Sequence, residues 1–233
     1  RQDIPAVLQW LARFRIMNVI AIDGPSASGK GTISAKVAQA LGWDTLDSGA
    51  LYRLSAYAAL QAGLAPEDES AIAELALKMQ IVFKDLCVFL DGEEVTEAIR
   101  QEAVGKLASK VATYPALRQA LLERQRLFAK EPGLVADGRD MGTVIFPHAP
   151  LKIFLVADVN ERAQRRYRQL QNLGLDGQFE SILADLQARD KQDMERPVAP
   201  LKPAADAHII DSSHLSIEET TQKVLELWRA QAG

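Results

Sequence analysis

The feature that most constrains this chain is the segment Gly24–Thr32, because its backbone has to curl tightly between a strand and a helix. Val19–Asp23 is an apolar run, the segment fits the pattern G-x-x-x-x-G-K, and an amphipathic helical pattern follows. Such a loop points several backbone N–H groups at one anion, and the helix N-terminus adds about half a positive charge there. Lys30 adds a point charge that reaches the β- and γ-phosphates. The segment therefore predicts a site for the phosphates of a nucleoside triphosphate, and we expect ATP.

The residues expected to bind ATP in this loop are Gly24, Pro25, Ser26, Ala27, Ser28, Gly29, Lys30, Gly31 and Thr32. Most such loops have Ser or Thr directly after the lysine. This chain has Gly31 and then Thr32, an ending typical of nucleoside monophosphate kinases. Loops of this class also occur in GTPase switches, motor ATPases and transporters. The loop therefore identifies the donor and leaves the reaction open.

The rest of the chain alternates short apolar runs with longer helical patterns, which is typical of an α/β fold with a parallel sheet covered by helices. The expected strands are Asn18–Asp23, Trp43–Leu46, Gly133–Asp137, Leu151–Ala157 and Ala207–Asp211. The expected helices are Lys30–Leu41, Gly49–Ala62, Asn160–Leu173, Gln178–Arg189 and Ser216–Ala230. The near-continuous apolar character of the strands predicts burial on both faces. Ligands of such sheets bind beyond the carboxyl ends of the strands.

One stretch, residues 66–112, interrupts this alternation. A helical pattern is followed by Gln80–Val95, which is typical of a hairpin with one turn near Asp85 and another at Asp91-Gly92. Antiparallel strands inside a parallel pattern predict an inserted subdomain at about 66–112.

Residues 1–16 stand before the first strand as an N-terminal extension, and the main domain is expected at 17–233. Apolar residues recur at helical spacing within Ile4–Phe14. Two interpretations are open: a short helix packed on the domain, or the tail of another domain fused upstream. Met17 would be a natural start if the domain were made alone.

Composition narrows the partners and the compartment. The net charge is −4 and the pI is near 5.5, so a uniform basic face for duplex nucleic acid is not expected. Cys87 is the single cysteine, which excludes an internal disulfide and fits a reducing compartment. No apolar stretch approaches the ~18 residues needed to span a bilayer. We expect a cytoplasmic monomer that binds neither nucleic acid nor membrane.

Charged residues stand at the carboxyl ends of two expected strands. An apolar strand that ends in Asp137 has the form of a Walker B strand, whose carboxylate orients Mg²⁺ directly or through water. Arg139 and Asp140 follow and are expected in the same cleft, and Arg53 carries the planar fork that binds phosphate in two places. We expect no direct protein ligand to Mg²⁺; the ion arrives with ATP, with Thr32 and Asp137 as candidates to contact it through water.

These segments together resemble those of the bacterial cytidylate kinases. The resemblance rests on Gly24–Thr32, Asp47–Arg53, Asp137–Thr143 and Arg196–Leu201, which occur in the family's order and spacing from about Val19 onward. It implies transfer of the γ-phosphoryl group of ATP to CMP or dCMP, in pyrimidine nucleotide metabolism. It also implies the P-loop nucleoside monophosphate kinase fold, with a five-stranded parallel sheet flanked by helices, an inserted NMP-binding subdomain and a short lid at about 158–175.

Carried over position by position, the resemblance assigns side chains to the acceptor nucleotide. It assigns Ser48, Ser109, Arg118 and Asp140 to the cytosine ring, Arg53, Arg139 and Arg196 to the acceptor phosphate, and Asp193 with Arg189 to the sugar hydroxyls. Cytosine offers an N4 amino donor and N3 and O2 acceptors, which suit a carboxylate facing an arginine. Uracil would leave the carboxylate unpaired, at a cost of roughly 1–3 kcal/mol.

Three arginines stand at i, i+3 and i+4 of the helix expected after Leu151–Ala157: Arg162, Arg165 and Arg166. Like charges at this spacing destabilise an isolated helix by ~0.2–0.5 kcal/mol per pair. A solvated basic face is the simpler interpretation. In a nucleotide kinase, the better one is a cluster that closes over ATP and neutralises the transferring phosphoryl group. We expect Lys30, Asp137, Arg139, Arg162 and Arg166 to act in catalysis, and Arg165 to bind ATP.

Two other functions stay open at this point. A sister kinase with another acceptor would share most of these features, and the pair Arg118 and Asp140 argues against it only through the resemblance. A nucleotide-dependent switch or binding module would share the loop but should lack the acceptor-site charges, which this chain has.

Overall fold

The computed structural model describes residues 18–84, 87–172 and 174–232. The N-terminal helix expected before Met17 and the turn expected near Asp85 lie outside these residues. The chain forms two compact units. Of the described residues, the first contains those up to Asp44 and those from Ala129 onward, and the second those within Thr45–Phe128. The narrower insert expected at 66–112 stays a prediction.

A five-stranded sheet has the strand order β2-β6-β1-β7-β8. Its strands are β1 (Val19–Asp23), β2 (Asp44–Asp47), β6 (Leu134–Gly138), β7 (Leu151–Val156) and β8 (His208–Asp211). β1 pairs in parallel with both β6 and β7, and β7 pairs in parallel with β8. Each strand begins and ends within one residue of its predicted range. The predicted α/β fold with a parallel sheet is confirmed.

Burial separates the centre of the sheet from its ends. Every residue of β1 and β6 is buried, as expected for strands covered on both faces. In β8, Ile210 is buried whereas Ile209 is 62 % exposed. The prediction of burial on both faces was therefore wrong for β8 and for β2, because these strands stand at the ends of the sheet and have a neighbouring strand on one side.

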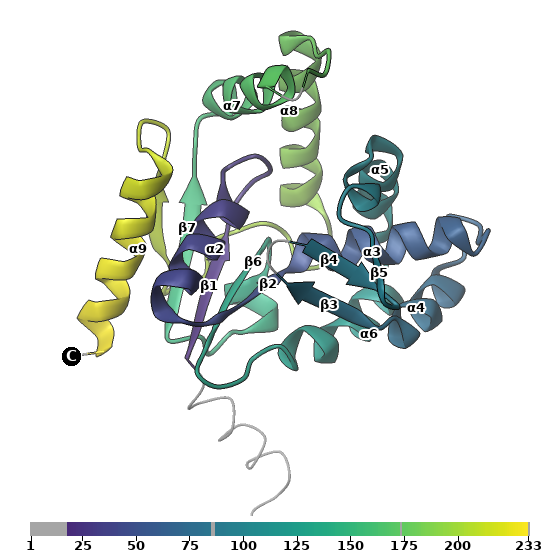
Figure 1. Ribbon diagram of the computed structural model, residues 1–233, viewed down its shortest axis with the longest axis horizontal. Helices are drawn as coiled ribbons and strands as arrows, with labels where there is room; N and C mark the ends of the chain where they lie inside the picture. Colours follow the sequence, from purple (N-terminus) through teal and green to yellow (C-terminus); the bar gives the residue numbers. More distant parts are fainter. Residues whose placement is uncertain (1–17, 85–86, 173, 233) are drawn as a thin grey trace, which may run out of the picture. The chain divides into compact units, whose positions relative to one another are not determined.

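The helices of the first unit are α2 (Lys30–Leu41), α7 (Val159–Asn172), α8 (Phe179–Glu195) and α9 (Ile217–Ala232), with the π-helical turn η2 (Met141–Ile145). α2 and α9 pack against each other and cover one face of the sheet (Figure 1). Side chains alternate along a strand, so Ile22 of β1 joins Ile33 of α2 and Val224 of α9 in one core. Trp43 and Trp228 meet edge to face in this layer, with ring centroids 4.9 Å apart. Among the described helices, none has the length and apolar run that a membrane span requires.

α8 is longer than predicted, because it continues past Arg189 to Glu195. Its end is set by Pro197, since the residue before a proline is driven out of the helical region. Arg196 accordingly has φ −61° and ψ 139°. The extension matters for the site because it places Asp193 on the helix, one turn after Asp190.

The second unit contains α3 (Ser48–Gln61), α4 (Glu69–Lys78), α5 (Glu102–Val111), α6 (Pro115–Arg126), the short helix η1 (Ala98–Arg100) and the strands β3 (Ile81–Lys84), β4 (Cys87–Leu90) and β5 (Glu93–Glu94). α3 packs on α5, and α4 packs on α6 (Figure 1). The three strands pair antiparallel, which confirms the predicted hairpin. The turn at Asp91-Gly92 has φ values of 51° and 89°, in the left-handed region that glycine adopts readily.

Candidate active site

The phosphate loop leaves β1 through Gly24 and enters α2 through Gly29. A Cβ on Gly24 would lie 2.3 Å from the backbone oxygen of Leu155 on β7, so only glycine lets the loop pass this strand. Gly29 is the N-cap of α2 and has φ 86°. A glycine cap has no side chain to satisfy the first N–H groups of the helix, which are the groups that bind anions in loops of this class.

Lys30 lies across this loop and is buried, with 7 % of its surface exposed. Its Nζ donates a hydrogen bond to the backbone oxygen of Pro25 at 2.8 Å, and Ser28 Oγ lies 3.5 Å away. The ammonium group is thus held inside the loop that is expected to receive the phosphates. Its position fits the predicted contact with phosphate.

Asp23, the last residue of β1, was not among the predicted site residues. Its carboxylate is buried and accepts the backbone N–H groups of Met141 and Gly142 at the start of η2, both at 2.8 Å. Burial raises the pKa of the Asp23 carboxyl to about 6, although those two hydrogen bonds favour the ionised form. Of the charged neighbours, Asp140 raises this pKa further and Lys30 lowers it. A carboxyl with so displaced a pKa, directly before a phosphate loop, is a candidate for a functional role.

The carboxyl end of β6 lies beside that of β1, with Asp137 in register with Ile22. Asp137 is buried. Arg139 follows and contacts the phosphate loop, where its Nη2 donates to Ser26 Oγ at 2.8 Å. Its Nε donates to Asp193 Oδ2 at 2.7 Å. Arg139 therefore links the loop to α8.

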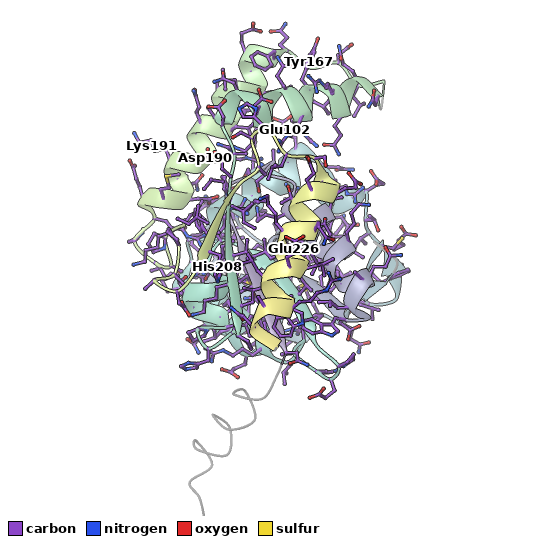
Figure 2. All side chains as sticks on the ribbon, turned by 90° about the vertical axis from the view of Figure 1, so that its left-hand side faces the viewer. Glu102, Tyr167, Asp190, Lys191, His208 and Glu226 are labelled. Atoms are coloured by element: carbon purple, nitrogen blue, oxygen red, sulfur yellow. The ribbon has the colours of Figure 1, made fainter. Side chains whose placement is uncertain are left out.

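Arg162 reaches the same loop residue from α7. It is buried, and its Nη1 donates to the backbone oxygen of Ser26 at 3.0 Å. It also makes two hydrogen bonds to the carboxylate of Asp190 on α8, at 3.1 and 2.5 Å. Figure 2 shows Asp190 next to the exposed Lys191 on α8. Arg139 was predicted from the segment after β6, and Arg162 from the arginine cluster on α7. Both donate hydrogen bonds to Ser26.

The two other arginines predicted for the lid have different partners. Arg165 is half-buried and donates to the backbone oxygens of Ser212 and Ser213, at 3.1 Å for the latter. Arg166 is exposed, and its Nη1 donates to Gln169 Oε1 at 2.9 Å. All three stand on α7 as predicted, but in this structure they do not share one set of contacts.

Asp140 and Arg196 form a buried pair of opposite charges. Asp140 is 2 % exposed and Arg196 9 %, and their nearest charged atoms lie 4.0 Å apart. Arg196 Nε also donates to the backbone oxygen of Ala199 at 2.6 Å. Arg189 is half-buried on α8, about one turn before Asp193. Five of the nine residues predicted for the acceptor therefore lie in the first unit: Arg139, Asp140, Arg189, Asp193 and Arg196.

In the second unit, two of the side chains predicted to contact the base lie on α3 and α6. Ser48 Oγ donates to Gln125 Oε1 at 2.6 Å, and both residues are buried. The guanidinium of Arg118 lies over the ring of Tyr52, 5.6 Å from its centroid, which is a cation–π contact. Arg118 Nη1 also donates to the backbone oxygen of Ala112 at 3.0 Å. Tyr52 and Gln125 thus support residues of the predicted base site.

Arg53 and Ser109 belong to the same unit. Arg53 is half-buried on α3, and its Nη1 donates to the backbone oxygen of Ile99 at 2.9 Å. Ser109 is half-buried on α5, the helix that packs against α3. Their roles toward an acceptor remain proposals.

Four residues with site contacts were missed by the sequence analysis: Asp23, Tyr52, Gln125 and Asp190. Asp23 carried little signal, because β2 and β8 also end in an aspartate. Asp190 fell just beyond the predicted end of its helix. Gln125 carried no signal, since a polar residue in a helix is normally exposed; here it is fully buried, and its Nε2 has no hydrogen-bond partner within the described ranges.

Comparison with known proteins identifies the family of this chain. The sequence matches the family described as "Cytidylate kinase" over residues 20–230. A cytidylate kinase of Bordetella bronchiseptica is 59% identical over 212 residues, which cover 91% of this chain and 95% of that protein. A cytidylate kinase of Cupriavidus necator is 53% identical over 215 residues, 92% of this chain and 97% of that protein. Among solved structures, a gluconokinase from Sinorhizobium meliloti matches 94% of this chain and 95% of its own at 16% identity, with a TM-score of 0.48. The chain belongs to the cytidylate kinase family.

Proposed function

We propose that the chain transfers the γ-phosphoryl group of ATP to CMP or dCMP, producing ADP and CDP or dCDP. The observation that carries this proposal is the convergence of Arg139 and Arg162 on Ser26. Two guanidinium groups from different elements bond to one residue of the phosphate loop. Family membership supports the choice of acceptor, since relatives that are 53% and 59% identical are cytidylate kinases.

The donor triphosphate binds to the loop Gly24–Thr32 and to the N-terminus of α2. Backbone N–H groups hold the phosphate oxygens, and the helix dipole favours the negative charge. Lys30 contacts the β- and γ-phosphates, and Arg165 adds a further cation from α7. The buried position of Lys30 in the loop supports this assignment.

The acceptor nucleotide is held by three sets of side chains. Arg53, Arg139 and Arg196 bind its phosphate; Ser48, Ser109, Arg118 and Asp140 bind the cytosine ring; Arg189 and Asp193 bind the sugar. Asp140 accepts a hydrogen bond from the N4 amino group, and Arg118 donates to the ring acceptors. The burial of Asp140 and Arg118 supports a selective site, because a buried charge left without its partner costs free energy.

The chemistry needs no covalent intermediate on the protein. An oxygen of the acceptor phosphate attacks the γ-phosphorus and forms a new P–O bond, while the bond from that phosphorus to the β–γ bridging oxygen breaks and ADP leaves. The reaction brings two anions together, so arginine charge is the main contribution of the protein. Arg139, Arg162 and Arg166 supply it, and closure of the lid excludes water that would hydrolyse ATP.

Mg²⁺ belongs to this proposal as the ion that accompanies ATP. Asp137, a buried carboxylate at the end of β6, and Thr32, an exposed hydroxyl in the first turn of α2, are oxygen donors of the kind that Mg²⁺ prefers. They would hold the hydrated ion through its water ligands. When bound, the ion neutralises charge on the β- and γ-phosphates.

We also propose a cytoplasmic monomer that acts in pyrimidine nucleotide metabolism. Residues 1–16 form an extension or the tail of an upstream domain, and 17–233 form the kinase domain. Within it, the NMP-binding insert covers about 66–112 and the lid about 158–175. The lid assignment is supported by α7, which lies in this range and carries Arg162, Arg165 and Arg166. Mass analysis of the native gene product tests the fusion.

A coupled ADP-release assay tests the proposed reaction, with CMP, dCMP, UMP, AMP and shikimate as acceptors. We expect strong stimulation by CMP and dCMP, and much weaker stimulation by the other three. Sustained multiple turnover also excludes a nucleotide-dependent switch. Stimulation by AMP or shikimate without stimulation by CMP would overturn the proposal.

A further inference from the structure

The phosphoryl-transfer chemistry leaves one buried carboxylate, that of Asp23, without a role. Asp23 ends β1 directly before Gly24 and is 4 % exposed. It therefore stands at the root of the ATP loop. Its carboxylate accepts two backbone N–H groups of η2, and this is the part of the site that Asp23 can influence.

Both oxygens of Asp23 are committed to η2, the turn that begins after Asp140. Oδ1 accepts the N–H of Met141 and Oδ2 accepts the N–H of Gly142, each at 2.8 Å. The carbonyl oxygen of Asp140 accepts two N–H groups further along the same turn, at 2.9 and 3.1 Å. The backbone of Asp140 is thus held by the turn, and the start of the turn is held by Asp23.

The contact between β1 and η2 is close as well as hydrogen-bonded. A Cβ on Gly142 would lie 3.5 Å from Asp23 Oδ2 and 3.1 Å from Cδ of Lys152 on β7. The backbone of η2 at Gly142 therefore packs directly against the side chains of Asp23 and Lys152.

The chemical type of residue 23 matters for this contact. An ionised carboxylate accepts on both oxygens, so it satisfies two N–H groups at once. An asparagine has one acceptor oxygen and one NH₂ group. Its NH₂ group would face one of the two backbone N–H groups of η2, and two donors cannot form a hydrogen bond. Burial of a charge costs free energy, which Lys30 partly offsets and Asp140 increases.

We propose that Asp23 is a positioning residue for acceptor selection. By holding the start of η2, it fixes the position of the Asp140 carboxylate relative to the ATP loop. In the proposed site, that carboxylate distinguishes cytosine from uracil. The inference rests on the proposed role of Asp140 in base recognition. It assigns to Asp23 no contact with either nucleotide.

The variant Asp23→Asn tests this proposal, because it keeps the shape of the side chain and removes one of the two acceptors. We expect the CMP-over-UMP ratio of kcat/KM to fall by about tenfold or more, the effect of losing one hydrogen bond to a charged group. The KM for ATP should change by less than about threefold, since the loop itself is intact. Asp68→Asn is the control: Asp68 Oδ1 also accepts a backbone N–H, that of Ala71, at 3.0 Å, but Asp68 lies on the surface at the start of α4, and the same change of residue there should leave the ratio unchanged.

A double variant separates positioning from a general structural role. If Asp23 acts through Asp140, adding Asp23→Asn to Asp140→Asn leaves the CMP-over-UMP ratio where Asp140→Asn alone has put it. An unchanged ratio in the single variant, or independent losses in the double variant, would overturn the inference. Asp23→Ser keeps one acceptor and replaces the asparagine variant if that variant fails to fold. A wild-type chain with no preference for CMP over UMP would instead refute the proposed function.

Discussion

Arg162 and Asp190 form a two-bond ion pair, in which Nη1 lies 3.1 Å from Oδ1 and Nη2 lies 2.5 Å from Oδ2. The pair joins α7 to α8, and its arginine also bonds to the backbone of Ser26. The two side chains are 5 and 13 % exposed, so water screens their interaction little. Asp190 thus holds, next to the phosphate loop, an arginine that the proposed reaction uses.

Replacing Asp190 by asparagine should affect both stability and turnover. Arg162 would be left as a buried charge without its carboxylate, and we expect the free energy of unfolding to fall by about 3 kcal/mol. The fold decrease in kcat should be larger than the fold change in the KM for ATP, because Arg162 loses the partner that orients it. Urea unfolding and steady-state kinetics measure these effects. Asp185→Asn, an exposed change on the same helix, is the control and should stay within about 0.5 kcal/mol of wild type; equal effects of the two changes would contradict the prediction.

The exposed arginine of the lid offers a second test. We expect Arg166→Ala to lower kcat by about tenfold or more with little change in KM for either nucleotide, since lid charges act in the transition state. Arg168, also exposed on α7, supplies the control Arg168→Ala, which should leave both constants near wild type. A large rise in KM with kcat intact would show that Arg166 contributes to ground-state binding instead.

Lys30 should be essential for turnover but not for binding of the acceptor nucleotide. We expect Lys30→Ala to lower kcat by at least about 100-fold, because the β- and γ-phosphates lose their buried cation. Binding of CMP, measured by calorimetry, should persist. Lys36→Ala, on the same helix, removes an ion pair of 3.3 Å with the exposed Glu218 and should leave kcat unchanged. Activity that survived in the Lys30 variant would refute the role given to it.

The raised pKa of Asp23 predicts a pH-dependent stability. Its ordinary pKa is 3.8, and the folded value is about 6. Between these values the folded chain retains a proton that the unfolded chain has released, so the stability contribution of this carboxyl is complete below pH 3.8 and is lost as the pH rises through about 6. The loss amounts to about 1.4 kcal/mol for each unit by which the two pKa values differ.

Urea unfolding of the wild type and of Asp23→Asn between pH 4 and pH 7 checks this prediction. The free energy of unfolding of the wild type, minus that of the variant, should decrease as the pH rises, because asparagine does not titrate. A difference that stayed constant would contradict the assigned pKa.

The parts of this fold that could be predicted are those with local signals. The phosphate loop is contiguous in sequence, and its glycines are required by the nearby backbone of Leu155. The strands were predicted within one residue because central strands such as β1 and β6 are apolar up to an aspartate at their carboxyl ends and are bounded by turn residues. The end of α8 was missed since the apolar pattern fades after Arg189, although the helix continues to the residue before Pro197.

The contacts that organise the site join residues that are far apart in the sequence. A local sequence pattern does not show such pairs. Asp23 and Met141 are 118 positions apart, and Ser26 and Arg162 are 136 apart. Asp190 was not predicted because a carboxylate on a polar helix is usually solvated. Its pairing with Arg162 follows from the packing of α7 against α8, which the sequence pattern does not reveal.

The packing of α9 on β1 also has a consequence for how the chain is made. Val224 of α9 and Ile22 of β1 share one core, although they come from opposite ends of the described chain. During synthesis β1 and the phosphate loop therefore emerge long before the helix that covers them, and the Trp43–Trp228 contact can form only after α9 has emerged. Contacts of such long sequence separation fold slowly. The nascent chain should accordingly expose part of its apolar sheet face until α9 has emerged.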